Sequence, residues 1–417
     1  MVGRIFVIFI LFQNIIFNCL PHPDYFSYWD ELSYIILLLL YLITKQFTHV
    51  RKQNFKVLVV CIGMILVGLS GNIFFGYAYS GGAIIRDIVG FTKFPLTFMV
   101  LMDTNYGEKL KDYAYKCIPF IKLMVFIIFA FGVLSLFIDI GMTQDEIRSG
   151  IHPYLFIYSH PTYLVSSMIC ILAILNASEE KLSVVYDLMI SIIIILSMRT
   201  KGIVAIVVYI FMKYGPKWIR KLKVLYWLAV LMIVIFASHS KLALYASYSN
   251  SPRESLYKGA LTIIQKCFPI GSGFATYASF VSVNYLSKVY DFVNVAGIYD
   301  YTGNFDPEIG DAGFSYYMGQ FGLIGSILFI YMAVQIVKAS ISSLEKDRRL
   351  PVILLLVYIA ITLTSEAILV NNGFELAVIL AIIVAMSKNR GKNCSVHHCR
   401  KYNRQKAKTH LKFRRNV

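Results

Sequence analysis

Charged residues are scarce in this chain, and acidic residues are the scarcest. Of its 417 residues, 15% are charged and only 23 are Asp or Glu, whereas 58% are hydrophobic and the mean hydropathy is +0.65. A soluble domain covers its surface with polar and charged side chains, which this composition does not supply. The composition therefore excludes an ordinary soluble domain and indicates a protein embedded in a membrane.

The chain also lacks the alternation of polar and apolar residues that marks a half-buried strand. Its apolar runs are roughly 17–25 residues long, enough to cross the hydrocarbon core of a bilayer as helices. Because lipid offers the backbone no hydrogen-bond partners, such runs must be helical. The expected spans are 4–20, 32–48, 56–76, 82–102, 117–138, 160–176, 183–197, 200–213, 222–238, 312–337, 350–366 and 371–387. The sequence thus predicts an all-α polytopic membrane protein with about 12 transmembrane helices.

Basic residues, in contrast, are abundant: 40 Lys and Arg give a formal net charge of +17. They concentrate in segments 45–56, 109–116, 213–223 and 338–349 and in the tail 388–417. With the expected spans these segments share one side of the membrane, which the positive-inside rule makes cytoplasmic, so both termini are expected there. No motif for nucleic-acid binding accompanies the charge. We therefore read it as a signal of topology and expect no nucleic acid as a partner.

Signatures of metal binding, cofactor binding and disulfides are missing too. The seven cysteines are scattered, mostly inside expected spans, where Cys behaves as a small hydrophobe. The tail segment Cys394–Cys399 contains two Cys and two His without the spacing of a zinc finger. The expected outer loops contain no Asp-x-Asp pair. We expect no disulfide framework, no metal ion and no cofactor.

One expected outer loop is long, whereas the others are short. It covers residues 239–311, between the ninth and tenth expected spans, and is rich in Tyr, Phe and Gly. Long connections are usually functional or disordered, and this one has no low-complexity run, so we expect a folded external subdomain. Its first helix is expected to begin at Pro252 and to end before Pro269. The domain organisation is a transmembrane domain, 1–387, that includes this subdomain, followed by the basic tail, 388–417.

Three basic residues stand at the outer face, where topology disfavours positive charge. Arg199 and Lys201 lie at the expected hairpin between two apolar runs, and Arg253 begins the external helix. A helix N-terminus attracts anions, and an arginine can bind a diphosphate through two parallel hydrogen bonds. These residues are candidates for an anion clamp. The alternatives are snorkelling of Arg199 and Lys201 to lipid phosphates, and a solvated Arg253.

Two further candidates for substrate binding lie near the same face. Arg86 is inside an expected span, where a charged side chain is energetically costly. It either takes part in substrate binding or forms an ion pair with Asp87 inside the bundle. His160 opens the span 160–176. It either donates to a phosphate or sugar or only begins the helix.

Asp311 is the candidate for acid–base chemistry. It stands in a Gly-Asp-Ala-Gly segment at the mouth of the span 312–337. A carboxylate at this place can take a proton from a sugar hydroxyl, or it can cap the helix that follows. Asp306 and Glu308 are nearby rivals for the same role.

Several motifs occur in the order found in a known family. They are Ser-Met-Arg-Thr at 197–200, Arg253 followed by Pro-Ile-Gly-Ser-Gly-Phe at 269–274, Asp311 to Phe314, and Gly322 to Gly325. With these motifs on this topology, the chain resembles the bacterial O-antigen and capsular polysaccharide polymerase family (Wzy), which is related to the O-antigen ligases. The resemblance covers most of the chain, and its motifs are degenerate.

The resemblance implies a GT-C-like fold in the bacterial cytoplasmic (inner) membrane and glycosyl transfer at its outer face. The donor would be a growing glycan on undecaprenyl diphosphate, the acceptor a lipid-linked repeat unit, and the leaving group undecaprenyl diphosphate. The diphosphate and glycan site would comprise Arg199, Lys201, Arg253, His160 and Arg86, with Asp311 as the catalytic base. Membrane lipids, a chain-length regulator and a flippase are the implied partners.

Other functions stay open. An O-antigen ligase uses the same chemistry with a lipid A–core acceptor. A lipid-linked oligosaccharide flippase or other transporter would carry charges deep in many spans, whereas we expect the charges of this chain at the outer ends. A non-enzymatic membrane scaffold is a further alternative.

Overall fold

The computed structural model describes residues 2–21, 28–44, 52–104, 106–148, 150–178, 183–218, 252–285, 287–293 and 313–388. Within these ranges the chain is helical and forms no strand, apart from isolated bridges that join Thr143 to Tyr154 and Arg148 to Ile151. The prediction of an all-α protein is confirmed for this part of the chain.

The helices follow the apolar runs of the sequence. Every expected span except 222–238 coincides with a helix, and 222–238 lies outside the described residues. The helices are α1 (Val2–Asn18), α2 (Trp29–Ile43), α3 (Lys52–Phe75), α4 (Gly81–Asp103), α5 (Tyr106–Leu134), α6 (Pro161–Ala177), α7 (Ser183–Leu196), α8 (Thr200–Trp218), α10 (Pro252–Lys266), α11 (Phe280–Asn284), α12 (Gly313–Ile341), α13 (Leu350–Leu363) and α14 (Ile368–Asn371), with a last helix over 373–388. Two 3-10 helices, η3 (Lys288–Asp291) and η5 (Lys346–Arg348), lie in connections.

Three described helices are long and apolar enough to cross a membrane: Asn54–Phe75, Tyr106–Leu134 and Gly313–Ile341. Shorter apolar helices accompany them at Val2–Asn18, Pro161–Ala177, Val184–Leu196 and Leu350–Leu363. A helix as short as α13, with 14 residues, is about 21 Å long, less than the roughly 30 Å of a hydrocarbon core. The helices therefore support a membrane protein, while the number of crossings stays a prediction.

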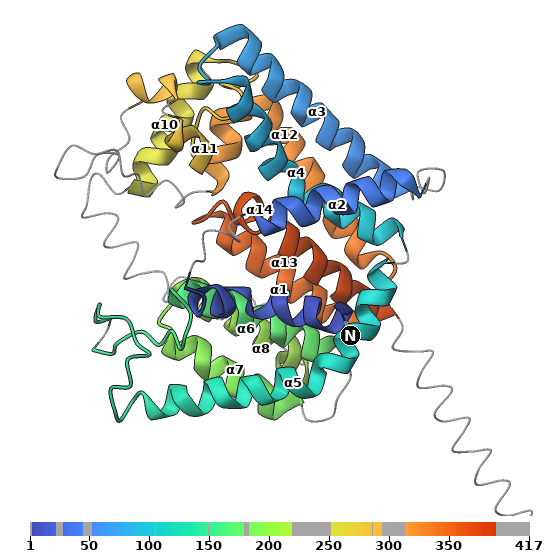
Figure 1. Ribbon diagram of the computed structural model, residues 1–417, viewed down its shortest axis with the longest axis vertical. Helices are drawn as coiled ribbons and strands as arrows, with labels where there is room; N and C mark the ends of the chain where they lie inside the picture. Colours follow the sequence, from blue (N-terminus) through green and yellow to red (C-terminus); the bar gives the residue numbers. More distant parts are fainter. Residues whose placement is uncertain are drawn as a thin grey trace, which may run out of the picture.

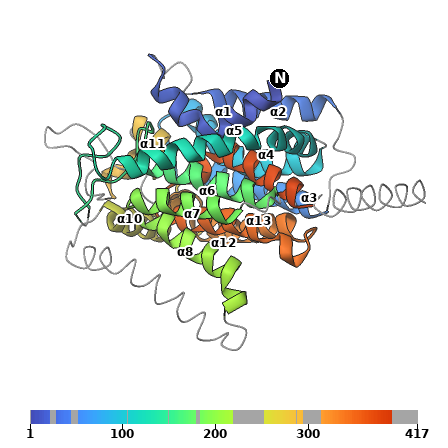
Figure 2. The same cartoon turned by 90° about the horizontal axis from the view of Figure 1, so that it is seen from below.

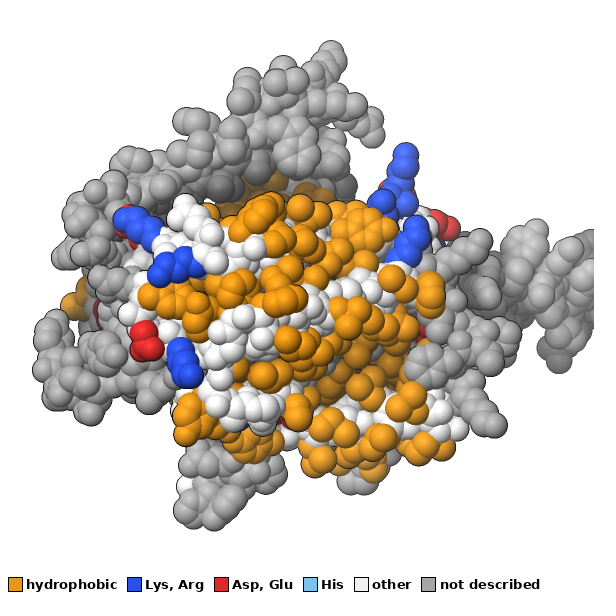
Figure 3. Space-filling model, turned by 90° about the horizontal axis from the view of Figure 1, so that it is seen from above, with side chains coloured by type: hydrophobic (Ala, Val, Ile, Leu, Met, Phe, Trp, Pro, Cys, Tyr) orange, Lys and Arg blue, Asp and Glu red, His pale blue; other side chains and the backbone are white. Residues whose placement is uncertain are grey.

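The lateral surface of the bundle has the character expected against lipid. On the face in Figure 3, an apolar belt runs between two ends at which Lys and Arg side chains gather. The exposed apolar side chains include Phe55, Val59, Ile62 and Leu66 of α3 and Leu323, Ile327, Ile330 and Val334 of α12. An apolar patch this continuous is unfavourable in water and stable against lipid tails.

The helices form one bundle with its functional candidates at one end. In Figures 1 and 2, α10, α11 and the segment between α5 and α6 lie at the same end, opposite the start of α1 and the close of helix 373–388. In Figure 1, α3, α4 and α10–α12 lie on one side and α1 and α5–α8 on the other. Helices α13 and α14 lie between them, since α13 packs on α6 and α8 and α14 packs on α4.

The described part of the long loop packs onto the bundle. Helix α10 begins at Pro252 and ends at Lys266, as predicted, and it lies against α12. Its apolar face is buried through Leu256, Ala260 and Ile263. Loop residues 239–251, 286 and 294–311 lie outside the described residues, so the prediction of an external subdomain is not tested there.

Candidate functional site

A tight corner between α7 and α8 presents Arg199. Met198 adopts a φ of 51°, a left-handed conformation that is uncommon for residues with a side chain. Ser197 is fully buried and donates to the Ile194 carbonyl at 2.6 Å, and the Leu196 carbonyl accepts from the Tyr154 amide at 2.9 Å. These bonds fix the corner to the segment between α5 and α6. The corner therefore faces protein.

Arg199 bonds side chains of that neighbouring segment. One terminal nitrogen of its guanidinium donates to Gln144 Oε1 at 3.0 Å and lies 2.7 Å from His160 Nε2. A guanidinium has only donors, so His160 Nε2 must accept, which keeps the imidazole neutral while this contact lasts. The side chain of Arg199 is thus held by protein groups.

His160 is the N-cap residue of α6. Its Nδ1 lies 3.3 Å from the Thr162 amide, and Pro161 occupies the first helical position, where proline is favoured. A neutral imidazole has only one nitrogen that can accept, so Nε2 toward Arg199 and Nδ1 toward the Thr162 amide cannot both accept, and the shorter contact belongs to Arg199. His160 therefore orients Arg199 from the position just before the helix.

Lys201 is paired with a carboxylate that the sequence did not single out. Its ammonium forms an ion pair with Glu366, whose side chain is 30% exposed, whereas that of Lys201 is 12% exposed. Glu366 lies in the turn between α13 and α14, where its amide donates to the Thr362 carbonyl at 2.8 Å. One signal could have found it, because an acidic residue stands alone at the end of an apolar run.

Arg253 joins the same group from the long loop. It lies in the first turn of α10, and both Arg199 and Arg253 are within electrostatic range of the Lys201 ammonium. Tyr257, one turn further, donates to the Thr364 carbonyl at 3.2 Å and so docks α10 beside the turn that carries Glu366. The structure therefore brings together Arg199, Lys201, Arg253 and His160, four of the predicted site residues.

The rim of this cation cluster carries an ion pair of its own. Arg148 donates to Glu146 at 2.7 Å, and this hydrogen bond lowers the pKa of Glu146, with smaller contributions from the charges of Arg148 and Arg199. Glu146 is therefore a carboxylate at neutral pH.

A cavity with both polar and apolar lining adjoins the cluster at Glu366. It has a volume of about 60 Å³ and lies among α1, α6, α13, α14 and helix 373–388. Its polar lining includes Gln13, Asn14, Ser166, Ser167, Glu366, Asn372 and Glu375. This volume holds about four to six water molecules. Amide, hydroxyl and carboxylate groups around such a space suit a ligand rich in hydroxyls.

The Pro-x-Gly-x-Gly-Phe motif serves packing. Gly271 and Gly273 have φ values of 77° and 94°, which glycine adopts without strain. The Gly273 amide donates to the Gln320 carbonyl at 2.9 Å, and Asn72 both donates to and accepts from the Phe274 backbone at 2.8 Å. The motif thus inserts between α3 and α12 and holds the end of α10.

Arg86 lies apart from the cluster. It donates to the Tyr28 hydroxyl at 3.1 Å and stands 5.1 Å from the centre of that ring. The alternative of an Arg86–Asp87 pair is wrong, because consecutive helical residues face different directions. Asp87 is 1% exposed and accepts from the Ala275 amide at 2.7 Å. Arg86 therefore has no contact that places it in the predicted site.

The expectation that charges collect at the outer ends also needs correction. Lys93, near the middle of α4, is 3% exposed and forms ion pairs with Asp30 at 2.5 Å and Glu31 at 2.9 Å. Both carboxylates come from the first turn of α2. Burial of a charge requires such partners. The sequence pattern did not show that the start of α2 reaches the middle of α4.

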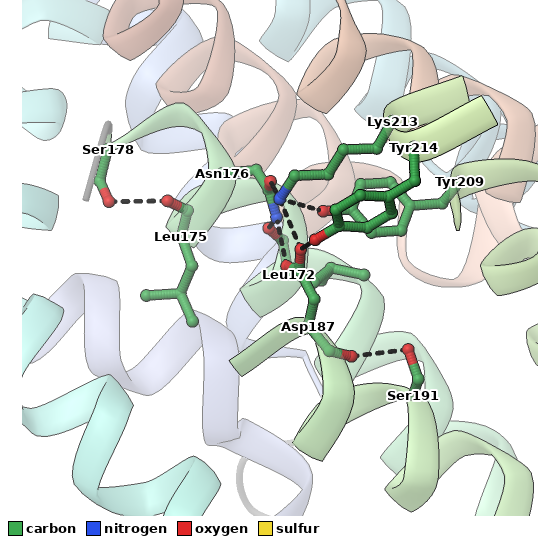
Figure 4. Close-up of polar contacts among 9 residues, drawn as sticks. All are labelled: Leu172, Leu175, Asn176, Ser178, Asp187, Ser191, Tyr209, Lys213 and Tyr214. Atoms are coloured by element: carbon green, nitrogen blue, oxygen red, sulfur yellow. Dashed lines mark hydrogen bonds and ion pairs between the residues drawn. The ribbon is translucent and has the colours of Figure 1, made fainter. Parts of the chain in front are cut away.

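A second buried ion pair lies at the opposite end of α8. Figure 4 shows Lys213 pointing at Asp187 of α7 and Asn176 of α6. Its ammonium donates at 2.5 Å to Asp187 Oδ2, at 2.5 Å to Asn176 Oδ1 and at 2.9 Å to the Tyr209 hydroxyl. An ammonium has three hydrogens, and these three acceptors use them. We therefore read the Lys213 cluster as a structural lock of α6, α7 and α8.

Asp311 and its rivals Asp306 and Glu308 lie outside the described residues, as does the tail with Cys394–Cys399. Among the residues that are described, no group of three or more His, Cys, Asp or Glu side chains is placed to hold a metal ion. The predicted base thus stays a prediction.

Comparison with known protein families and with characterised proteins finds no match for this chain. The resemblance to polysaccharide polymerases therefore rests on the sequence motifs, and the functional argument rests on the geometry of the cation cluster.

Proposed function

We propose that the protein is a polysaccharide polymerase. It would transfer a growing glycan from undecaprenyl diphosphate to a lipid-linked repeat unit at the outer face of the bacterial cytoplasmic membrane, without a metal ion. The proposal includes about 12 transmembrane helices in a GT-C-like arrangement with both termini in the cytoplasm. A chain-length regulator and a flippase are its proposed partners.

One observation carries the proposal: three cations from two distant parts of the chain converge at one end of an apolar bundle. Arg199 and Lys201 come from the α7–α8 corner and Arg253 from α10, and both arginines are within electrostatic range of the Lys201 ammonium. Like charges repel, so this group favours a bound anion in addition to the Glu366 carboxylate that pairs with Lys201. A diphosphate at the membrane surface is an anion of suitable charge.

The chemistry of glycosyl transfer needs this charge. As the bond between the sugar and the diphosphate breaks, negative charge grows on the leaving oxygen, and fixed cations stabilise it most in the transition state. Arg199 is oriented in advance by Gln144 and His160. Orientation before reaction is what makes such stabilisation effective.

The test is polymerisation of a defined lipid-linked repeat unit by purified protein. We expect Arg199→Ala and Arg253→Ala each to abolish long chains and to weaken binding of undecaprenyl diphosphate by about 10- to 100-fold, the worth of charge-assisted hydrogen bonds. Arg86→Ala is the matched control, because Arg86 contacts Tyr28 and not the cluster. Normal chain length in both cluster variants would overturn the proposal.

An O-antigen ligase differs from a polymerase in its acceptor, and a deletion strain distinguishes the two. A deletion strain that accumulates long glycans on undecaprenyl diphosphate would indicate a ligase, whereas single capped repeats indicate a polymerase.

The buried network of Lys93 favours one candidate from another class, a lipid-linked oligosaccharide transporter. Charges within spans are typical of substrate or ion paths, and Lys93 and Asp30 are buried in the bundle. A transporter would move a labelled lipid-linked oligosaccharide across a liposome membrane without lengthening it. A polymerase would lengthen it.

A further inference from the structure

We propose that Glu366, in place of Asp311, is the general base of the reaction and that the cavity beside it receives the hydroxyl of the acceptor sugar. This inference rests on the proposed function and adds a second substrate site to it. Glu366 stands at the boundary of two features, since it pairs with Lys201 of the cation cluster and also lines the cavity.

The turn after α13 explains how one carboxylate reaches both features. Helix α13 ends at Leu363, and α14 begins at Ile368, so Glu366 projects from a short connection. The Tyr257 hydroxyl holds this connection through the Thr364 carbonyl, and Arg253 lies one turn from Tyr257 on α10. The cation cluster, which would bind the donor, and the cavity, which would bind the acceptor, therefore meet at Glu366.

In the resting protein, Glu366 acts as the counter-ion of Lys201. This ion pair holds the carboxylate at the ammonium. A diphosphate carries more negative charge than one carboxylate and takes the place of Glu366 at Lys201. Binding of the donor thereby frees Glu366 from Lys201 to accept a proton at the cavity that it lines.

The cavity suits the acceptor side. Asn14, Ser166, Ser167 and Asn372 line it, and their amide and hydroxyl groups both donate and accept hydrogen bonds, as a sugar hydroxyl requires. Glu375 lies at the same cavity but is only 5% exposed and accepts from Gln13 at 3.2 Å. Of the two carboxylates at the cavity, Glu366 is the one that contacts the cation cluster, through Lys201.

The step balances without any further reactant. Glu366 takes the proton of the acceptor hydroxyl while the oxygen of that hydroxyl attacks the anomeric carbon of the donor sugar. The bond between that carbon and the diphosphate oxygen breaks, and its electron pair leaves with undecaprenyl diphosphate near Arg199, Lys201 and Arg253. The proton on Glu366 then passes to water, which restores the ion pair with Lys201.

The experiment compares Glu366→Gln with wild type in lipid nanodiscs, by turnover of a lipid-linked repeat unit and by binding of undecaprenyl diphosphate. We expect turnover to fall by about 100- to 10,000-fold, the usual contribution of a general base. We expect diphosphate binding to be about two- to fivefold tighter, because the competing carboxylate is gone. Glu366→Asp should recover part of the turnover.

Glu345→Gln is the matched control, since Glu345 pairs with Arg348 in the connection between α12 and α13, remote from the cavity. The inference would be overturned if Glu366→Gln turned over substrate at the wild-type rate. It would also be overturned if Glu366→Gln unfolded at the wild-type temperature but lost both turnover and diphosphate binding. A wild-type protein that binds the lipid but forms no polymer would instead overturn the proposed function.

Discussion

His160 shows how a neutral side chain can prepare a charged one. Its Nε2 faces the Arg199 guanidinium at 2.7 Å, and its place at the N-cap of α6 fixes the ring. An arginine has several flexible torsions, and a second contact at Gln144 restricts them further. Orientation of Arg199 before substrate arrives lowers the entropy that binding must remove.

This role predicts a graded effect of substitution. His160→Ala should weaken diphosphate binding by about three- to tenfold, because Arg199 loses a contact that orients it before the diphosphate binds. His160→Gln, whose amide oxygen can accept from Arg199, should keep most of the affinity. Equilibrium binding of undecaprenyl diphosphate to both variants measures this, and equal losses in the two would contradict a role in orienting Arg199.

At the scale of elements, the inserted loop between α10 and α11 positions the long connection on the bundle. Asn72 of α3 pairs with both backbone groups of Phe274, and the Ser272 amide donates to the Gly319 carbonyl of α12 at 3.0 Å. Phe274 itself is fully buried. The placement of Arg253 therefore depends on contacts made some twenty residues further along the chain, at the other end of α10.

Removal of the Asn72 side chain tests that dependence. Asn72→Ala leaves a backbone donor and a backbone acceptor of Phe274 without these bonds, so we expect a loss of about 2–4 kcal/mol in stability. Turnover should fall with it, because α10 loses its anchor. Thermal unfolding in detergent gives the first quantity. Unchanged unfolding temperature and turnover would show that the loop does not hold α10.

For the whole molecule, the apolar runs predicted where helices lie, but not which helices meet. Apolar side chains on every face of a helix carry no information about its neighbours. The position of Lys93 in a span was visible in the sequence, whereas its partners Asp30 and Glu31 on α2 were not. The sequence did not identify Glu366 as a site residue for the same reason. Its place in the site depends on the ion pair with Lys201, which is far away in sequence. The corner of Arg199 was found because local charge interrupted an apolar run.

The Lys93 network predicts a strong effect on the stability of the bundle. Lys93→Met leaves the buried carboxylate of Asp30 without its cation, and we expect a loss of about 3–5 kcal/mol. The double variant Lys93→Met with Asp30→Asn removes the buried pair and leaves only the partly exposed Glu31 carboxylate, so it should recover most of that loss. Thermal unfolding of both variants measures this, and a double variant no more stable than the single one would contradict it.

Helix α8 carries a lysine of functional interest at one end and the Lys213 cluster near the other. Lys201 and Lys213 are twelve positions apart, about 18 Å along the axis and about 120° around it. A helix is stiff to twisting over so short a length, so its angular setting at one end is transmitted to the other. The contacts of Lys213 with Asp187 and Asn176 fix the rotation of α8 about its axis. They thereby set the direction in which Lys201 points, although they lie far from the cation cluster.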